Sequence, residues 1–163
     1  MKTMVLSELF RKLAPQKHSK MKVKIKKLHE NAVIPKYAKA GDAGLDLTAT
    51  SKTWNPDAKA YVYGTGLAVE IPEGYVGLIF PRSSNYKKDV FMTNSVGVID
   101  SGFRGEMLVC FKDRDEGKKH YPYEVGDRIA QLIILPYPTI EFEEADELSE
   151  TERGAGGHGS TGK

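Results

Sequence analysis

Apolar and polar residues alternate in short runs between Met21 and Tyr137, with the period of two that is typical of half-buried strands rather than the 3.6 of a helix. Turn-forming stretches such as KAGDAG, NPDAK, PEG and VGD separate the runs. We expect strands at 22–28, 44–50, 60–71, 75–80, 91–99, 106–113, 128–135 and 140–145. Many short strands at this spacing predict an all-β sandwich, jelly roll or barrel.

Residues 1–20 depart from this pattern, and we interpret them as an N-terminal extension that is either disordered or a short helix. Pro15 would end a helix whose apolar face is formed by Leu6, Leu9, Phe10 and Leu13. The apolar stretch is too short and too interrupted for a secretory signal, and a targeting or membrane-surface role is the less favoured alternative. We interpret Met21 as the original start of the chain.

The composition indicates one soluble domain with its own hydrophobic core. Cys110 is the only cysteine among 163 residues, which excludes an internal disulfide and suits a reducing compartment, so we expect a cytoplasmic protein. Residues 1–27 carry nine Lys or Arg and one Glu, whereas the remainder carries 15 basic and 21 acidic residues. The body is therefore not a basic nucleic-acid-binding surface, and no apolar run approaches a membrane span. We expect neither stable nucleic-acid binding nor a membrane partner.

The segment RGAGGHGSTGK at 153–163 has the glycine and lysine spacing of a phosphate-binding P-loop. A P-loop also needs a Ser or Thr and a helix after the lysine, and nothing follows Lys163, so we do not expect one. Five glycines in eleven residues favour a mobile tail. The alternative is a flap that closes over an anion, with Arg153 as a donor. We expect the β domain to span 21–148 and this glycine-rich segment to span 149–163.

Four further stretches place polar residues in or beside apolar strands: AGDAGLDLTA, FPRSSNY, NSVGVIDSGFRGEM and GDRIAQLII. Each has a plain structural explanation. Asp100 before Ser-Gly can start the turn of a β-hairpin, Arg82 can pair with a surface acid, and Gln131 can satisfy a core network. Asp46 lies between leucines and needs water, a partner or a metal ion, because a bare carboxylate is costly to bury.

Together with the tail, these stretches resemble the five motifs of the trimeric deoxyuridine triphosphatases (dUTPases), in the same order and spacing. AGDAGLDLTA, PRSS, GVIDSGFRGE, GDRIAQLI and RGAGGHGSTGK carry the resemblance, which covers 21–163. It implies an all-β, jelly-roll-like (β-clip) fold and a homotrimer whose active sites are shared between subunits. It also implies hydrolysis of dUTP to dUMP and pyrophosphate with Mg²⁺, under a flap that a neighbouring subunit donates.

The resemblance assigns roles to individual residues. Asp100 matches the general base that directs water at the α-phosphate, and Asp46 matches a residue that reaches Mg²⁺ indirectly, through water. The residues that match the phosphate-binding segments are Arg82, Ser83, Ser84 and Gln131, and those that match the flap are Arg153, His158, Gly159, Ser160 and Thr161. The arginine fork suits phosphate because it donates hydrogen bonds in pairs.

The family's uracil pocket falls on the predicted hairpin. It matches the Asn94 side chain and backbone groups around Val98, Ile99 and Leu108, with Phe103 under the sugar. Backbone donors and acceptors at fixed spacing can imitate a pairing partner for uracil, and tight packing excludes the thymine methyl group.

Three residues depart from the family pattern. Ser84 replaces a glycine, and Phe103 replaces a tyrosine and so lacks its hydroxyl. His158 stands where a phenylalanine stacks on uracil. Imidazole also stacks, and its protonation near neutral pH predicts flap closure that depends on pH.

Two other functions stay open. A dCTP deaminase, or a bifunctional deaminase–dUTPase, shares the fold and an Arg-Ser-Ser segment, but it uses a glutamate base where this chain has GVIDSGFRGE. A non-catalytic jelly-roll assembly module is the second alternative, and it would have no need for Asp100, Arg82, Gln131 and Arg153 together.

Overall fold

The computed structural model describes residues 20–114 and 121–157. Within these ranges the chain forms strands and one 3-10 helix, η1 (Ser83–Lys87), and contains no α-helix. The strands are β1 (Lys24–Lys27), β2 (Leu45–Thr48), β3 (Ser51–Asn55), β4 (Ala60–Gly64), β5 (Leu67–Glu70), β6 (Tyr75–Pro81), β7 (Val90–Met92), β8 (Gly97–Ile99), β9 (Leu108–Asp113) and β10 (Arg128–Pro136). The prediction of an all-β fold is confirmed.

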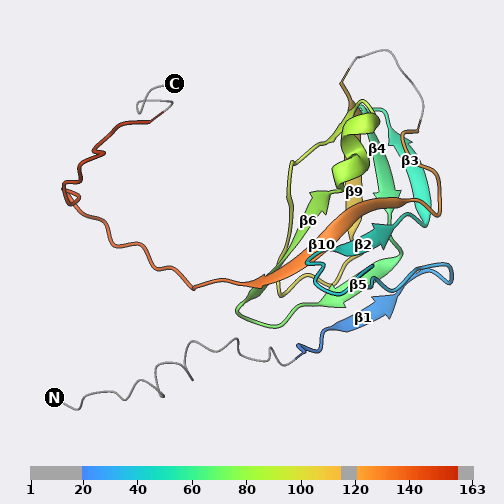
Figure 1. The fold of residues 1–163 in the computed structure, drawn as a ribbon, viewed down its shortest axis with the longest axis horizontal. Coiled ribbons are helices and arrows are strands. Elements are labelled where there is room, and N and C mark those ends of the chain that lie inside the picture. The colour runs from blue at the N-terminus through green and yellow to red at the C-terminus, as the bar shows by residue number, and fades with distance from the viewer. Residues whose placement is uncertain (1–19, 115–120, 158–163) are drawn as a thin grey trace.

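Two four-stranded antiparallel sheets form the body (Figure 1). One has the order β2-β10-β6-β8 and the other β3-β4-β9-β7, while β1 and β5 form a separate pair. A single buried cluster contains side chains from both sheets, among them Leu47 and Ile79 from the first and Tyr63 and Phe111 from the second. The apolar face of each sheet is thus buried against the other, as in a jelly roll.

Two of the expected strands are each divided between two elements. The stretch 60–71 forms β4 and β5, because the chain turns at Gly66, whose φ is +66°. The stretch 91–99 forms β7 and β8 in different sheets, with Ser95 between them at a φ of 58°. Strand β3 was not predicted, because its sequence SKTWN is mostly polar. Its main packing contact is that of the Trp54 ring on Tyr61.

The predicted hairpin around Asp100 is wrong in its strand pairing. Strand β8 pairs with β6, whereas β9 pairs with β4 and β7, so residues 100–107 cross from one sheet to the other. The Phe103 N–H donates to the carbonyl of Asp100 at 3.1 Å, which closes the turn at its start. At the end of this crossing segment, Oε1 of Glu106 accepts a hydrogen bond from the Gly66 N–H at 2.7 Å.

The strand predicted at 140–145 is also wrong. Residues 138–157 contain no strand, and this arm leaves the body after β10 (Figure 1). Its apolar side chains are exposed, with Phe142 at 94%. The alternating pattern is typical of a strand, but a strand needs a partner, and the described part of the chain offers none here. Across the ranges 20–114 and 121–157, we find no helix that is both long and apolar enough to span a membrane.

Gly66→Ala is expected to destabilise the fold more than Gly74→Ala. Both glycines have positive φ, +66° and +79°, but an added Cβ would lie 2.9 Å from Cβ of His29 at Gly66 and would meet nothing within 4 Å at Gly74. We expect a loss of about 1 kcal/mol at Gly74 from the backbone alone, and of about 3 kcal/mol at Gly66 from backbone and overpacking together. Urea unfolding measures both, and equal losses would contradict this account of Gly66.

Candidate active site

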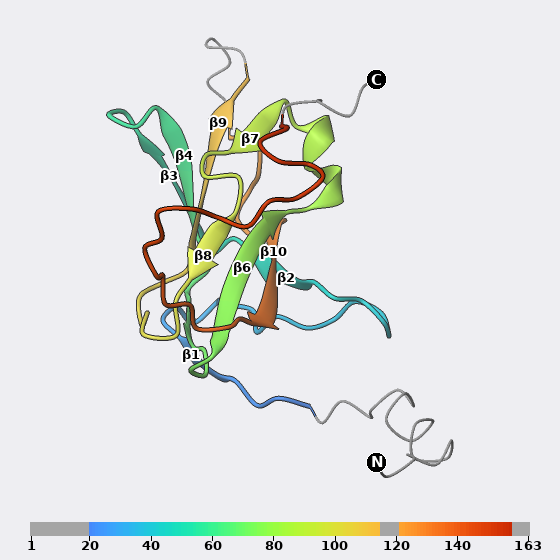
Figure 2. The same cartoon turned by 90° about the vertical axis from the view of Figure 1, so that its left-hand side faces the viewer.

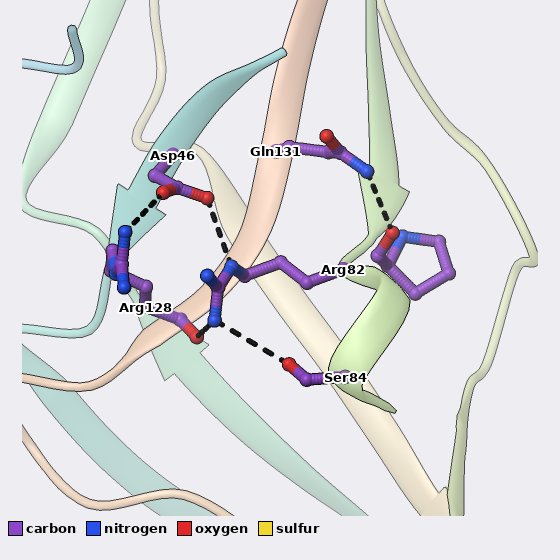
Figure 3. A network of polar contacts seen from close by, with 6 residues as sticks. Asp46, Arg82, Ser84, Arg128 and Gln131 are labelled. Carbon is purple, nitrogen blue, oxygen red and sulfur yellow. Dashed lines mark hydrogen bonds and ion pairs between the residues drawn. The ribbon is translucent and has the colours of Figure 1, made fainter. Parts of the chain in front are cut away.

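Asp46 binds two arginines at one end of the first sheet (Figure 3). Its Oδ1 accepts a hydrogen bond from Nε of Arg82 at 2.9 Å, and its Oδ2 accepts one from Nη1 of Arg128 at 2.8 Å. The strand register explains the meeting, because Asp46 lies opposite Gln131, which lies opposite Phe80. Side chains alternate along a strand, so Arg82 emerges on the same face as Phe80. The partner that the sequence required for Asp46 is thus a pair of guanidinium groups.

Arg82 connects this ion pair to η1. Its Nη1 donates to the carbonyl of Arg128 at 3.3 Å and lies 3.5 Å from Oγ of Ser84. Arg82 is also the residue that precedes η1, so Ser83 and Ser84 begin the helix beside it. Ser84 is not among the residues with positive φ, so a side chain here needs no strained backbone. The change from glycine adds a hydroxyl that faces Arg82.

Gln131 lies on β10 next to the same network. Its Nε2 donates to the carbonyl of Pro81 at 3.1 Å, which ties β10 to the end of β6 (Figure 3). Gly44 lies against this amide, because a Cβ there would overlap Oε1 of Gln131. The structure therefore brings four of the predicted residues together: Asp46, Arg82, Ser84 and Gln131.

Arg128 belongs to this site and was missed in the sequence. A basic residue at the first position of a strand is ordinarily a solvated surface residue, so the pattern gave no reason to assign Arg128 to a site. The available signal was its place three residues before Gln131, inside GDRIAQLI. It adds a second positive charge, and its side chain is 54% exposed.

Asp100 lies in a different place, directly after β8. It lines a cavity of about 270 Å³ together with Tyr75, Val76, Ser101 and Tyr137. Asp100 is exposed, and among the described residues its carboxylate has no hydrogen-bond or ion-pair partner. The carboxylate is therefore available to accept a proton from water.

Most of the other residues predicted for the base pocket flank the same turn, whereas Asn94 precedes β8 at the opposite end of that strand. Val98 and Leu108 are exposed, at the edge strand β8 and at the start of β9. Asn94 lies close to Gly97, because a Cβ built there would be 3.7 Å from its Nδ2. The Phe103 ring lies against Gly105, where a Cβ would come within 2.6 Å of its Cζ.

The turn after β8 and the helix η1 lie at opposite ends of β6 (Figure 2). Val76, near the start of β6, lines the cavity of Asp100, whereas Arg82 follows the last residue of β6. At about 3.3 Å per residue, six residues of strand separate the two ends by roughly 20 Å. Within one chain, the predicted catalytic base and the predicted phosphate-binding residues are thus far apart.

Arg153 contacts neither group. It lies on the arm after β10, where its Nε donates to the carbonyl of Gly156 at 2.9 Å. His158, Gly159, Ser160 and Thr161 lie outside the described residues. In the ranges 20–114 and 121–157, no three His, Cys, Asp or Glu side chains gather in a way that would hold a metal ion.

A family model described as dUTPase matches residues 30–162 of this chain. The chain belongs to the dUTPase family. A "Deoxyuridine 5'-triphosphate nucleotidohydrolase" of Gloeothece citriformis is 40% identical over 143 residues, which cover 87% of this chain and 97% of the relative. A protein of the same name from Hydrogenobaculum sp. is 44% identical over 145 residues, which cover 87% and 99%.

Solved dUTPase structures share the fold. A mutant of the Staphylococcus bacteriophage 80alpha dUTPase, solved with dUpNHpp, has a TM-score of 0.70 at 29% identity and covers 87% of this chain and 99% of that one. A mutant dUTPase from phage phi11 of S. aureus, described with a structural Mg(II) ion, has a TM-score of 0.65 at 27% identity and covers 78% and 98%. This family's fold is the jelly roll that the sequence predicted.

Asp46→Asn is expected to destabilise the dUTPase by about 2 kcal/mol, because it leaves two guanidinium groups without their carboxylate. The Asp46 and Arg82 side chains are only 22% and 25% exposed. Glu70→Gln is the matched control, since the Lys24–Glu70 pair is 82% and 44% exposed and should contribute less than about 0.5 kcal/mol. Urea unfolding compares the two, and similar losses would contradict a structural role for the Asp46 pair.

Proposed function

We propose that this chain hydrolyses dUTP to dUMP and pyrophosphate by attack of water on the α-phosphate, with Asp100 as the general base. The observation that carries the proposal is the exposed Asp100 carboxylate, which lines a cavity of about 270 Å³ and has no partner among the residues that the structure describes. A general base must reach its water at hydrogen-bond distance, and a carboxylate already paired with arginine would be a poorer acceptor. That comparison favours Asp100 over Asp46.

The phosphates bind where Arg82, Ser83, Ser84 and Gln131 meet. The Arg82 guanidinium is oriented by Asp46 and offers its remaining N–H groups to phosphate oxygens. Hydroxyl and N–H groups at the start of η1 stabilise charge on the departing pyrophosphate. The flap, with Arg153, His158, Gly159, Ser160 and Thr161, closes over the bound nucleotide.

The base binds beside the turn after β8. Backbone groups of Val98, Ile99 and Leu108, with the Asn94 side chain, pair with the edge of uracil, and the Phe103 ring lies under deoxyribose. The position of Phe103 is fixed by Gly105, which leaves room for the ring. A 2′-hydroxyl above this ring would be crowded and without a hydrogen-bond partner, which favours deoxyribose.

The length of β6 supports a homotrimer with shared sites. One dUTP cannot contact Asp100 and Arg82 of the same chain across roughly 20 Å. A closed ring of chains can bring the Asp100 end of one copy to the Arg82 end of the next.

The arm supports the same assembly. Ile140, Phe142 and Leu148 are 68%, 94% and 89% exposed, so no apolar surface among the described residues covers them. An apolar groove of about 460 Å³, lined in part by Ile25, Leu45 and Ile134, offers such a surface on another copy. Exchange of arms would carry Arg153 to a neighbouring site.

Mg²⁺ fits this site as an ion that arrives on the triphosphate. It is commonly held by one or two carboxylates together with substrate phosphates, and the described residues offer single carboxylates rather than a cage. Asp46 would reach it through water, because both of its oxygens already accept hydrogen bonds. When bound, the ion offsets the negative charge of the phosphates. We also propose that the enzyme acts in the cytoplasm without a nucleic-acid or membrane partner.

Asp100→Asn is expected to lower kcat for dUTP by about a hundredfold to ten-thousandfold, because the amide cannot take a proton from water. Binding of dUpNHpp should change little, since Asp100 acts on water rather than on the nucleotide. Asp57→Asn, an exposed carboxylate in the turn between β3 and β4, is the control. Pyrophosphate release measures turnover. Full activity in Asp100→Asn would refute the proposed base, and ammonia release from dCTP would favour the deaminase.

A further inference from the structure

The helix η1 presents Ser83 and Ser84, yet none of its residues is buried. Apolar packing therefore cannot hold it, and its position depends on polar contacts. Asn85, in the middle of η1, makes two side-chain hydrogen bonds to residues outside the helix. Its Nδ2 donates to the carbonyl of Val90 in β7 at 3.2 Å, and its Oδ1 accepts a hydrogen bond from the Tyr123 hydroxyl at 2.9 Å.

Tyr123 is itself fixed by the core. It is 4% exposed, and its ring packs on Phe111 with centroids 5.2 Å apart. Its N–H donates to the Tyr63 hydroxyl at 3.1 Å, and that hydroxyl donates to its carbonyl at 3.0 Å. Tyr63 is 0% exposed and lies in β4. Both ends of Tyr123, the backbone and the hydroxyl, are thus held by hydrogen bonds.

The Tyr123 hydroxyl is a dependable donor to Asn85. Burial raises the pKa of this phenol above its ordinary value, although the nearby Arg82 charge acts in the opposite direction. The hydroxyl therefore stays protonated at neutral pH. Nζ of Lys88 lies 5.0 Å from the ring centroid and covers part of the aromatic face.

We propose that Tyr123, acting through Asn85, is a positioning residue for the phosphate-binding end of the active site. The connection runs from Tyr63 in the core through Tyr123 and Asn85 to η1, and so to Ser83 and Ser84. The role proposed for Tyr123 is indirect, because its hydroxyl donates to Asn85. The inference rests on the proposed function and deepens it, because it names what holds the serines that bind the phosphate chain.

The inference predicts that loss of the Tyr123 hydroxyl weakens binding of the phosphate chain and leaves binding of the base unchanged. Tyr123→Phe removes one hydroxyl and keeps the buried ring, so η1 loses an anchor while the core stays packed. We expect the KM for dUTP to rise about fivefold, which is the usual effect of one lost hydrogen bond. The inhibition constant of deoxyuridine should not change, because the turn proposed to bind the base and the sugar lies at the other end of β6. Deoxyuridine has no phosphates.

Two further variants separate positioning from general damage. Tyr61→Phe is the matched control, because it also removes a tyrosine hydroxyl, bonded to Oδ2 of Asp113 at 2.8 Å, but not one bonded to η1. It should leave the KM for dUTP unchanged. Asn85→Leu should raise the KM at least as much as Tyr123→Phe, because it also removes the hydrogen bond to the carbonyl of Val90. The double variant should be no worse than Asn85→Leu alone, since Tyr123→Phe removes a contact that Asn85→Leu has already removed.

Different failures point to different conclusions. An equal rise in the dUTP KM and the deoxyuridine inhibition constant, or the same rise in Tyr61→Phe, would overturn the inference. Additive effects of Tyr123→Phe and Asn85→Leu would also overturn it. If the wild-type protein left dUTP intact, the proposed function would fail instead. Calorimetry with tripolyphosphate would then test the same variants, with weaker binding in Tyr123→Phe as the expected result and unchanged binding as the contrary one.

Discussion

Strand β6 sets the main constraint on this active site, because it holds two sets of functional residues apart. The strand runs from Tyr75 to Pro81 and is paired along its length with β10, so it cannot shorten or bend to bring its ends together. Asp100 lies near one end and Arg82 directly follows the other. Catalysis that uses both residues on one nucleotide therefore requires more than one chain. The shared site that we propose for a homotrimer is thus supported by the length of this strand.

The charges around Asp46 and around Asp100, at the two ends of β6, differ. At the Arg82 end, Asp46 shares its two oxygens between Arg82 and Arg128, so two positive charges surround one negative charge where we propose that the phosphates bind. At the other end, Asp100 has no such partner among the described residues and stays available to water. The different surroundings of these two carboxylates support the different roles that we propose for them.

The fold class and half of the site could be predicted from the sequence, and the rest depended on long-range contacts. Alternation of period two revealed most strands, but strand pairing is a tertiary property, so β8 was assigned to β9 rather than to β6. The alternating residues 140–145 predicted a strand, but no strand in the described part of the chain pairs with them. The contact between Asn85 and Tyr123 joins residues 38 positions apart, and no local pattern indicates it. Motif order, by contrast, identified Asp46, Arg82 and Gln131, which the strand register then brought together.

Mixing two inactive variants tests the central claim most directly. Asp100→Asn keeps Arg82, and Arg82→Ala keeps Asp100, so each variant alone should be inactive. Chains unfolded together in equal amounts and refolded should form mixed trimers. If each site takes Asp100 from one chain and Arg82 from another, random assembly restores about a quarter of the wild-type dUTP turnover. A mixture that stays inactive while its trimers form would show that one chain supplies both residues, and would contradict the account.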